Sequence, residues 1–281
     1  LRGASATGTE PEATCSQRMA SQSRDLIDRP IRGLAYAWSG IAIMWAFWIC
    51  FFIFLSSPRR LLDVWPLPTV DHGGFVGPPV IAVLIDVGLI ALFGLQHSLM
   101  ARPWFKKRVT HRLPPAFERC TSVHMANLSL FALVIFWQPI TAEIWNLSRG
   151  PWRDAVWALF VAGWVILFLG ARSFGIFELL GLKQMRAWTD GERPAAIPLK
   201  TGLLYRWLRH PMYVGVLTAV WATPRMTAGH LLLAIGFTLY VLIALRYEER
   251  DLRVQFGATY QRWRMSHGQD PRTLKDTQRA R

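Results

Sequence analysis

Cysteine is scarce in this chain: Cys15, Cys50 and Cys120 are its only three, and no two of them are close in sequence. This spacing argues against a zinc ribbon and against a disulfide framework. The seven histidines lack the i, i+3 or i, i+4 spacing that is typical of a metal site on a helix. No glycine-rich phosphate loop follows a strand, and no strands are apparent. We therefore expect neither a metal nor a Rossmann domain.

Charge is absent from several long stretches. Residues 34–55 and 155–171 carry none, whereas 78–100 carry only Asp86 and 121–145 only Glu143. A helix needs about 20 mainly apolar residues to cross a bilayer, and each stretch approaches that length. A further apolar region contains a break at 223–225, which predicts two antiparallel arms. The sequence thus predicts an all-α polytopic membrane protein with five to six transmembrane helices, the last two forming a helical hairpin.

Acidic residues are fewer than basic ones, 18 against 32, and the formal net charge is +14. Of the 32 lysines and arginines, 27 lie before residue 34, in 101–120, in 172–210 or from 246 onward. Because positive charge favours the cytoplasmic side, this alternation predicts that both chain ends face the cytoplasm. It favours contact with anionic membrane lipids over nucleic acid. We expect a flexible segment over 1–33, a transmembrane domain over 34–265 and a flexible basic tail over 266–281.

Two polar clusters flank the predicted hairpin. The first is Arg209-His210-Pro211-Met212-Tyr213-Val214-Gly215, and the second is Glu248-Glu249-Arg250-Asp251. At about 1.5 Å per residue, arms of roughly 20 and 30 Å would return the second cluster to the membrane face of the first. Taken singly, an Arg-His pair also suits a lipid phosphate, and two glutamates also suit a solvated helix end. Taken together, the clusters predict a ligand site.

The same residues resemble a known group of enzymes. The run Leu199-Lys200-Thr201-Gly202-Leu203-Leu204-Tyr205-Arg206, the first cluster and the Glu248-Glu249 pair resemble the membrane methyltransferases. That group includes isoprenylcysteine carboxyl methyltransferases and phospholipid N-methyltransferases. The resemblance implies S-adenosylmethionine as co-substrate.

A narrower resemblance covers most of the chain. It rests on 96–103, Glu118-Arg119, Trp137-Gln138-Pro139 and 221–231, which look like the bacterial methanethiol S-methyltransferases, relatives of the NnrU-like membrane proteins. The similarity implies methyl transfer to methanethiol, giving dimethyl sulfide, in the bacterial cytoplasmic (inner) membrane with the active site facing the cytoplasm. Two alternatives stay open. One is a membrane methyltransferase acting on a lipid amine or an isoprenylcysteine carboxylate, and the other is a non-catalytic NnrU-like membrane protein.

The chemistry of S-adenosylmethionine suggests roles for these residues. Arg209 and His210 can bind its carboxylate, and the glutamates can accept hydrogen bonds from its ribose hydroxyls or its ammonium group. Tyr213 offers a ring face and a hydroxyl, and Gly215 permits close approach of backbone or cofactor. The candidate cofactor-binding residues are Arg209, His210, Tyr213, Gly215, Glu248, Glu249 and Tyr205.

Methylation of a thiol also requires that its proton be removed, because a free thiol keeps its proton up to about pH 8.5. The catalytic candidates are His97 and Asp86, which lie within about 20° of the same helix face because eleven residues turn a helix by about 1100°. An ionisable group inside an apolar span is a functional candidate by default. The alternative for Asp86 is a packing role with Asn127, His124 or a backbone group. We expect His230 to be structural.

Overall fold

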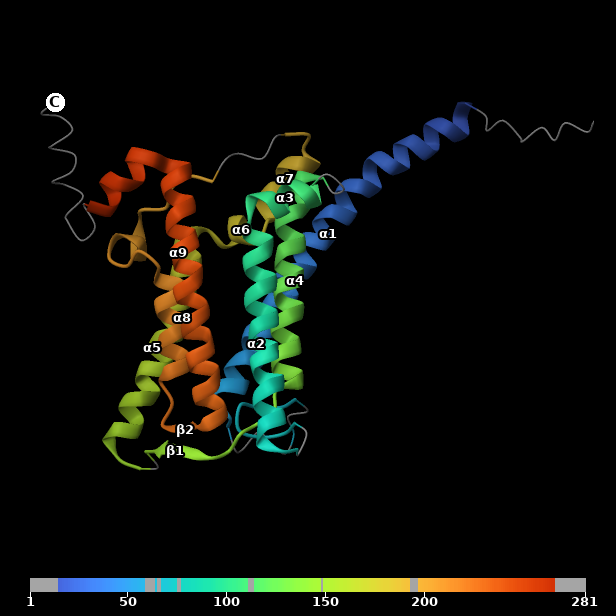
Figure 1. Ribbon diagram of the computed structural model, residues 1–281. Helices are drawn as coiled ribbons and strands as arrows, with labels where there is room; N and C mark the ends of the chain where they lie inside the picture. Colours follow the sequence, from blue (N-terminus) through green and yellow to red (C-terminus); the bar gives the residue numbers. More distant parts are fainter. Residues whose placement is uncertain are drawn as a thin grey trace, which may run out of the picture.

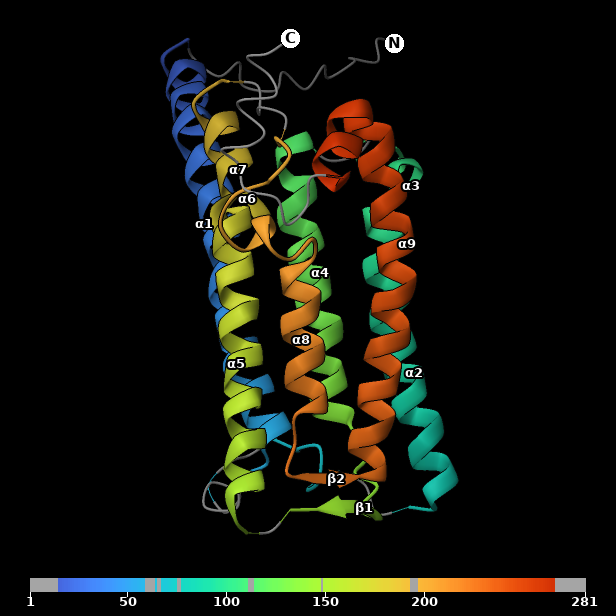
Figure 2. The same ribbon diagram turned by 90° about the vertical axis from the view of Figure 1, so that its left-hand side faces the viewer.

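The computed structural model describes residues 15–58, 64, 67–74, 77–110, 114–147, 149–192 and 197–265. Five long helices form a bundle, in which four run side by side and α1 is oblique, with its N-terminal half leaving the bundle (Figures 1 and 2). They are α1 (Cys15–Ser56), α2 (Pro79–Ala101), α4 (Pro115–Phe136), α5 (Pro151–Phe174) and α9 (Ala228–Met265). The shorter elements are α3 (Pro103–Thr110), α6 (Ile176–Leu179), α7 (Leu182–Thr189), the 3-10 helix η1 (Leu203–Arg206) and α8 (Pro211–Trp221).

The five long helices are each long and apolar enough to cross a membrane. Helix α8 is apolar but has only 11 residues, so it is about 17 Å long and covers part of a bilayer core. Within α9 the apolar part ends at Leu245, and the helix beyond Arg246 is charged and extends outside the span. The predicted all-α polytopic fold with five to six spans is therefore confirmed, with α8 as the partial sixth.

Proline begins most of the helices that follow a connecting segment. Helices α2, α4, α5 and α8 start at Pro79, Pro115, Pro151 and Pro211. The first N–H groups of a helix have no partner within it, and the fixed φ of proline suits its first turn. For α8 this means that the helix begins directly after the Arg209-His210 pair, which fixes that pair at the helix entrance.

Helix α8 packs closely against α5 through two glycines. A Cβ atom added to Gly215 would lie 2.4 Å from the Leu167 backbone nitrogen, and one added to Gly163 would lie 2.7 Å from the Ala219 nitrogen. Neither position has room for a side chain, because the obstacle in each case is backbone. The two helix backbones therefore approach closely, and α5 fixes the position of α8.

Two short antiparallel strands join the connections at one end of the bundle. These are β1 (Glu143–Asn146) and β2 (Arg225–Thr227), with Glu143 opposite Thr227 (Figure 1). We call this the β end, and the opposite end, which carries α6, α7 and the last part of α9, the polar end. The strands have no counterpart in the sequence prediction because segments this short show no clear period of two.

The first helix begins well before its apolar span. Helix α1 starts at Cys15 and continues without interruption into the span, and the flexible segment expected over 1–33 stays a prediction. Once a span has formed a helix, extending it by further residues costs little, since nucleation is the unfavourable step. The expected flexible tail, 266–281, lies outside the described residues.

Candidate active site

The hairpin of α8 and α9 brings the two polar clusters into contact at the polar end. His210 Nε2 lies 3.0 Å from Glu249 Oε1, across 39 residues of sequence. Its other ring nitrogen, Nδ1, lies 3.8 Å from Glu248 Oε1. The predicted return of the acidic cluster to the basic one is therefore confirmed.

Glu249 is the most fully bonded carboxylate of this cluster. The Tyr260 hydroxyl donates to its Oε1 at 2.7 Å, and Arg253 lies 3.7 Å from its Oε2. Tyr260 reaches it because α9 bends at Gly257, where φ is +51° and ψ is −126°, so that the end of the helix turns over the polar end (Figure 1). Glycine is the residue that adopts this backbone conformation readily.

Protonation of Glu249 is affected by these contacts. Its partial burial would raise the pKa, but the hydrogen bonds from His210 and Tyr260, together with the positive charge of Arg209, lower it below its ordinary value. Because only 19% of its side chain is exposed, Glu249 has little surface left for a ligand. Its contacts indicate a positioning role, in which it fixes His210 and closes the hairpin.

Glu248 differs from its neighbour. Its side chain is 43% exposed, and it interacts with the hydroxyl of Tyr213. Two more tyrosines, Tyr205 from η1 and Tyr240 from α9, lie within electrostatic range of its carboxylate. Burial, and then the charge of Glu248, raise the pKa of Tyr205 to about 12, so this phenol remains protonated and can donate a hydrogen bond. Glu248 therefore keeps free acceptor capacity among three aromatic rings.

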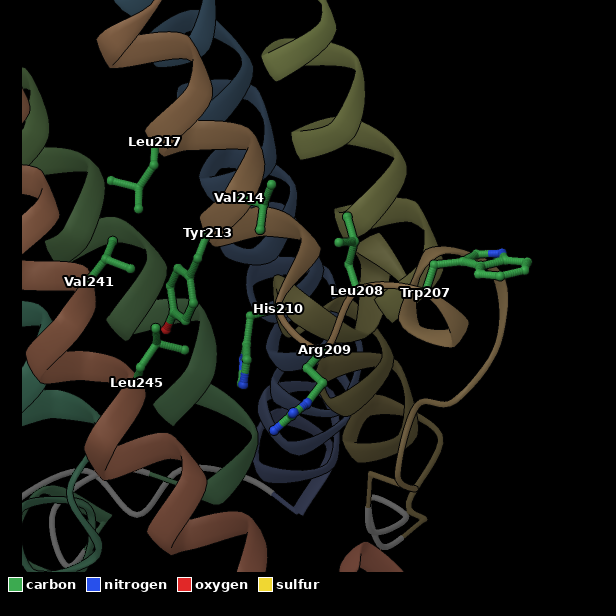
Figure 3. A pocket seen from close by; sticks show the side chains of 9 residues that line it. All are labelled: Trp207, Leu208, Arg209, His210, Tyr213, Val214, Leu217, Val241 and Leu245. Carbon is green, nitrogen blue, oxygen red and sulfur yellow. The ribbon is translucent and has the colours of Figure 1, made fainter. Parts of the chain in front are cut away.

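A pocket of about 370 Å³ lies beside this cluster, between α8 and α9. In Figure 3, Tyr213 and Leu217 of α8 point toward Val241 and Leu245 of α9, and Val214 lines the pocket from further along the α8 surface. Arg209, His210 and Trp207 line its polar end. The pocket thus joins a basic entrance to an apolar interior.

Contacts from other elements hold the walls of the site in place. Arg102, which follows α2, pairs with Asp251 at 3.3 Å and lies over the Tyr247 ring at 4.7 Å, which fastens α2 to α9. Lys200 Nζ lies 2.7 Å from Glu178 Oε2, which anchors the segment before η1 to the short helix α6. The motif beginning at Leu199 is thereby fixed beside the helical hairpin.

His97 lies one turn before the end of α2 and is exposed. Its ring contacts those of Phe93 and Tyr240, at centroid distances of 5.6 and 6.3 Å. Tyr240 in turn lies within electrostatic range of Glu248 and Tyr213, so it connects His97 to the polar cluster. Our sequence analysis missed Tyr240, although a phenol inside an apolar span two turns before Glu248 is a signal that could have identified it.

Two candidates lie away from the cluster. Asp86 is buried and accepts a hydrogen bond from the Gln138 backbone N–H at 2.8 Å, near the β end. It shares a helix face with His97 but lies about 16 Å from it along α2, so the structure does not bring the two together. Gly215 faces α5 rather than the pocket, so the close approach that it permits is that of backbone.

His230 is buried at the β end, with 1% of its surface exposed. Its Nε2 lies 2.9 Å from the Val220 carbonyl oxygen, which joins the start of α9 to the end of α8. The expected structural role of His230 agrees with this contact. Within the described residues, no group of three or more His, Cys, Asp or Glu side chains could hold a metal ion.

Comparisons with known proteins identify the class of protein to which the chain belongs. The family model described as phospholipid methyltransferase matches residues 155–259, which include η1, α8 and both polar clusters. The chain is also 43% identical over 196 residues to methanethiol S-methyltransferase of Mycobacterium tuberculosis, covering 70% of this chain and 80% of that protein. It is 45% identical over 226 residues to methanethiol S-methyltransferase of a Pseudomonas species, covering 78% and 85%.

These matches place the chain in the family of methanethiol S-methyltransferases, within the broader class of membrane methyltransferases. A more distant relative is nurim of Xenopus laevis, which is 36% identical over 180 residues, covering 59% of this chain and 61% of that protein. No solved structure matches the chain.

Proposed function

We propose that this protein transfers a methyl group from S-adenosylmethionine to a small thiol, and that the thiol is methanethiol, giving dimethyl sulfide. The observation that carries the proposal is the 3.0 Å contact between His210 and Glu249, which brings the basic and acidic clusters together beside a pocket. Family membership supports the reaction class, since the relatives are named for it.

The residues of the polar end fit S-adenosylmethionine by their chemistry. Arg209 is exposed at the pocket and can bind a carboxylate through two parallel N–H groups. Glu248 can accept from an ammonium group or from ribose hydroxyls, and Tyr205 and Tyr213 offer phenol donors and ring faces beside it. When bound, S-adenosylmethionine supplies a methyl group on a positively charged sulfur.

The acceptor thiol needs a group that takes its proton and an apolar place for the reaction. The acceptor sulfur must lose its proton before a new sulfur–carbon bond forms, and we assign the proton acceptor to His97, which is exposed and in contact with Tyr240. The apolar side chains of the pocket offer water few hydrogen-bond partners, which favours a displacement in which opposite charges disappear. We leave Asp86 out of this mechanism because its partner is the Gln138 backbone N–H.

The location of the site is part of the proposal. We infer that the protein lies in a bacterial cytoplasmic membrane with the polar end facing the cytoplasm. Support comes from the segments rich in lysine and arginine, because those described connect the helices at the polar end. Alkaline phosphatase fused at Arg149, in the β-end connection, should be active, and a fluorescent protein fused at the C-terminus should fluoresce inside the cell. The reverse pattern would overturn the orientation.

The experiment that tests the reaction compares acceptors. Purified protein in detergent receives S-adenosylmethionine with methanethiol, with phosphatidylethanolamine or with a prenylated cysteine, and headspace gas chromatography and mass spectrometry detect the methylated products. We expect dimethyl sulfide as the main product, and none from the Glu248→Gln variant. Methylation of the lipid or of the prenylcysteine in place of methanethiol would mean that methanethiol is not the acceptor. The assignment as a methyltransferase would still hold.

A further inference from the structure

We propose that the apolar part of the pocket between α8 and α9 binds the alkyl group of the acceptor thiol, and that its walls determine the length of acceptor that the enzyme uses. This proposal rests on the proposed function and deepens it. The wall residues are Val214 and Leu217 of α8 and Val241 and Leu245 of α9.

The pocket has a polar end and an apolar end, as an acceptor site for a small thiol requires. Arg209 and His210 lie at the helix entrance, and Leu217 lies two turns further along α8, about 10 Å from Pro211. Positions 210, 213, 214 and 217 share one helix face, as do 241 and 245 on α9, so the two faces oppose each other (Figure 3). A thiol with its alkyl group among these side chains would direct its sulfur toward the polar cluster.

The chemistry of the walls selects a short neutral alkyl group. Apart from Arg209, His210 and Tyr213, the lining residues include no charged side chain and no hydroxyl. Methanethiol is small, neutral and soluble in lipid, and Val214, one turn into the apolar helix α8, is 39% exposed. An acceptor could therefore enter from the membrane core without crossing the charged polar end.

The walls are also rigid, which a pocket that measures length requires. Gly215 and Gly163 bring the α8 and α5 backbones together, so α8 cannot move toward α5 to widen the groove. Val241, with 1% exposure, and Phe237 one turn earlier on α9 belong to the packed core of the bundle. A longer chain would meet fixed side chains, and one methylene group in such a pocket changes selectivity by about 10-fold or more.

The test measures the ratio of methylation rates for 1-propanethiol and methanethiol, with methyl propyl sulfide and dimethyl sulfide quantified by headspace gas chromatography. Leu217→Ala and Val241→Ala enlarge the pocket and should raise this ratio at least fivefold. Leu239→Ala is the matched control, since Leu239 lies on α9, is 56% exposed and does not line the pocket. Its ratio should equal that of the unaltered protein.

A second variant covers the case in which the enlarged proteins fail to fold. Val214→Phe fills the groove from a partly exposed position and should raise the KM for methanethiol while the affinity for S-adenosylmethionine, measured by calorimetry, stays within twofold. If neither the rate ratio nor this KM moves, the pocket assignment is wrong. A loss of S-adenosylmethionine affinity in Leu217→Ala would assign the groove to the co-substrate and also overturn it. If the unaltered protein methylates no thiol, the proposed function fails instead.

Discussion

The two ends of the α8–α9 hairpin use the same kinds of residue in different ways. At the β end, Thr227 donates to Asp71 at 2.7 Å and accepts from the His230 backbone N–H, and His230 bonds the Val220 carbonyl. All of these residues except Val220 are polar, and all are buried. At the polar end, His210 meets Glu249 and Glu248, and these carboxylates remain partly exposed beside a pocket.

The difference shows how to separate a structural histidine from a functional one in this protein. His230 bonds a backbone carbonyl through Nε2 and is buried, so it presents no open surface to a ligand. His210 meets ionisable groups that face open space, and such groups are typical of ligand sites. Four experiments test whether the two ends of the hairpin differ in this way.

The largest effect is expected from the exposed carboxylate at the polar end. Glu248→Gln keeps the shape of the side chain but removes the charge that would face a bound ammonium group. The affinity for S-adenosylmethionine, measured by calorimetry in detergent, should fall more than about 100-fold, or roughly 3 kcal/mol. Glu143→Gln at the β end, where the carboxylate pairs with Arg225, is the control and should bind normally. Equal affinity in the unaltered protein, Glu248→Gln and Glu143→Gln would mean that S-adenosylmethionine does not bind at the polar end.

A smaller effect, on rate alone, is expected at His97. His97→Ala should lower turnover by about 100-fold, the lower part of the range for a general base, and leave the affinity for S-adenosylmethionine unchanged. Phe93→Leu, which removes a ring that contacts His97 but no ionisable group, is the control. An unchanged rate in His97→Ala from pH 6 to 9 would reject the base assignment.

At the β end the expected effect is on stability. Thr227→Val removes the hydroxyl that donates to Asp71 and leaves that buried carboxylate without this partner. Unfolding in denaturant should become easier by about 1–3 kcal/mol, while S-adenosylmethionine affinity stays the same. Thr218→Val, on α8 where the hydroxyl donates only to the Val214 carbonyl, is the matched control and should change stability less. Loss of cofactor affinity in Thr227→Val would mean that the two ends do not act separately.

The smallest effect concerns pH. The pKa of Glu249 is lowered in the folded protein, so its contacts contribute stability above the ordinary glutamate pKa of about 4.3. That contribution is lost as the pH falls through the lower folded value. The thermal midpoint of the unaltered protein should therefore drop more steeply between pH 5 and 3 than that of Glu249→Gln. Parallel curves for the two proteins would show that the carboxylate has no stabilising contacts.

Much of this architecture could be predicted from the sequence. Uncharged stretches identified the spans, and the 223–225 break identified the hairpin that joins the two polar clusters. The family, carried by the 199–206 run, the Arg209-His210 motif and the Glu248-Glu249 pair, is confirmed by the relatives. These features are local in sequence or repeat with a fixed period, so they are visible without coordinates.

The features of the site that the sequence did not predict depend on how the helices pack. Sequence periodicity placed Asp86 and His97 on one helix face but did not reveal that Asp86 accepts a hydrogen bond from the Gln138 backbone N–H. The two adjacent glutamates looked equivalent until the bend at Gly257 brought Tyr260 to Glu249 alone. The part of Tyr240 in the site became visible only through its proximity to His97 of α2 and Tyr213 of α8. Contacts between distant segments have no signature in a single sequence.

The most direct test of the account is a double-mutant cycle between the two clusters. S-adenosylmethionine affinity is measured by calorimetry for the unaltered protein, His210→Gln, Glu249→Gln and the double variant. If Glu249 acts on the cofactor through the position of His210, the two effects will be non-additive by about 1–3 kcal/mol. Effects that add within about 0.5 kcal/mol would mean that the contact between α8 and α9 does not form a single site.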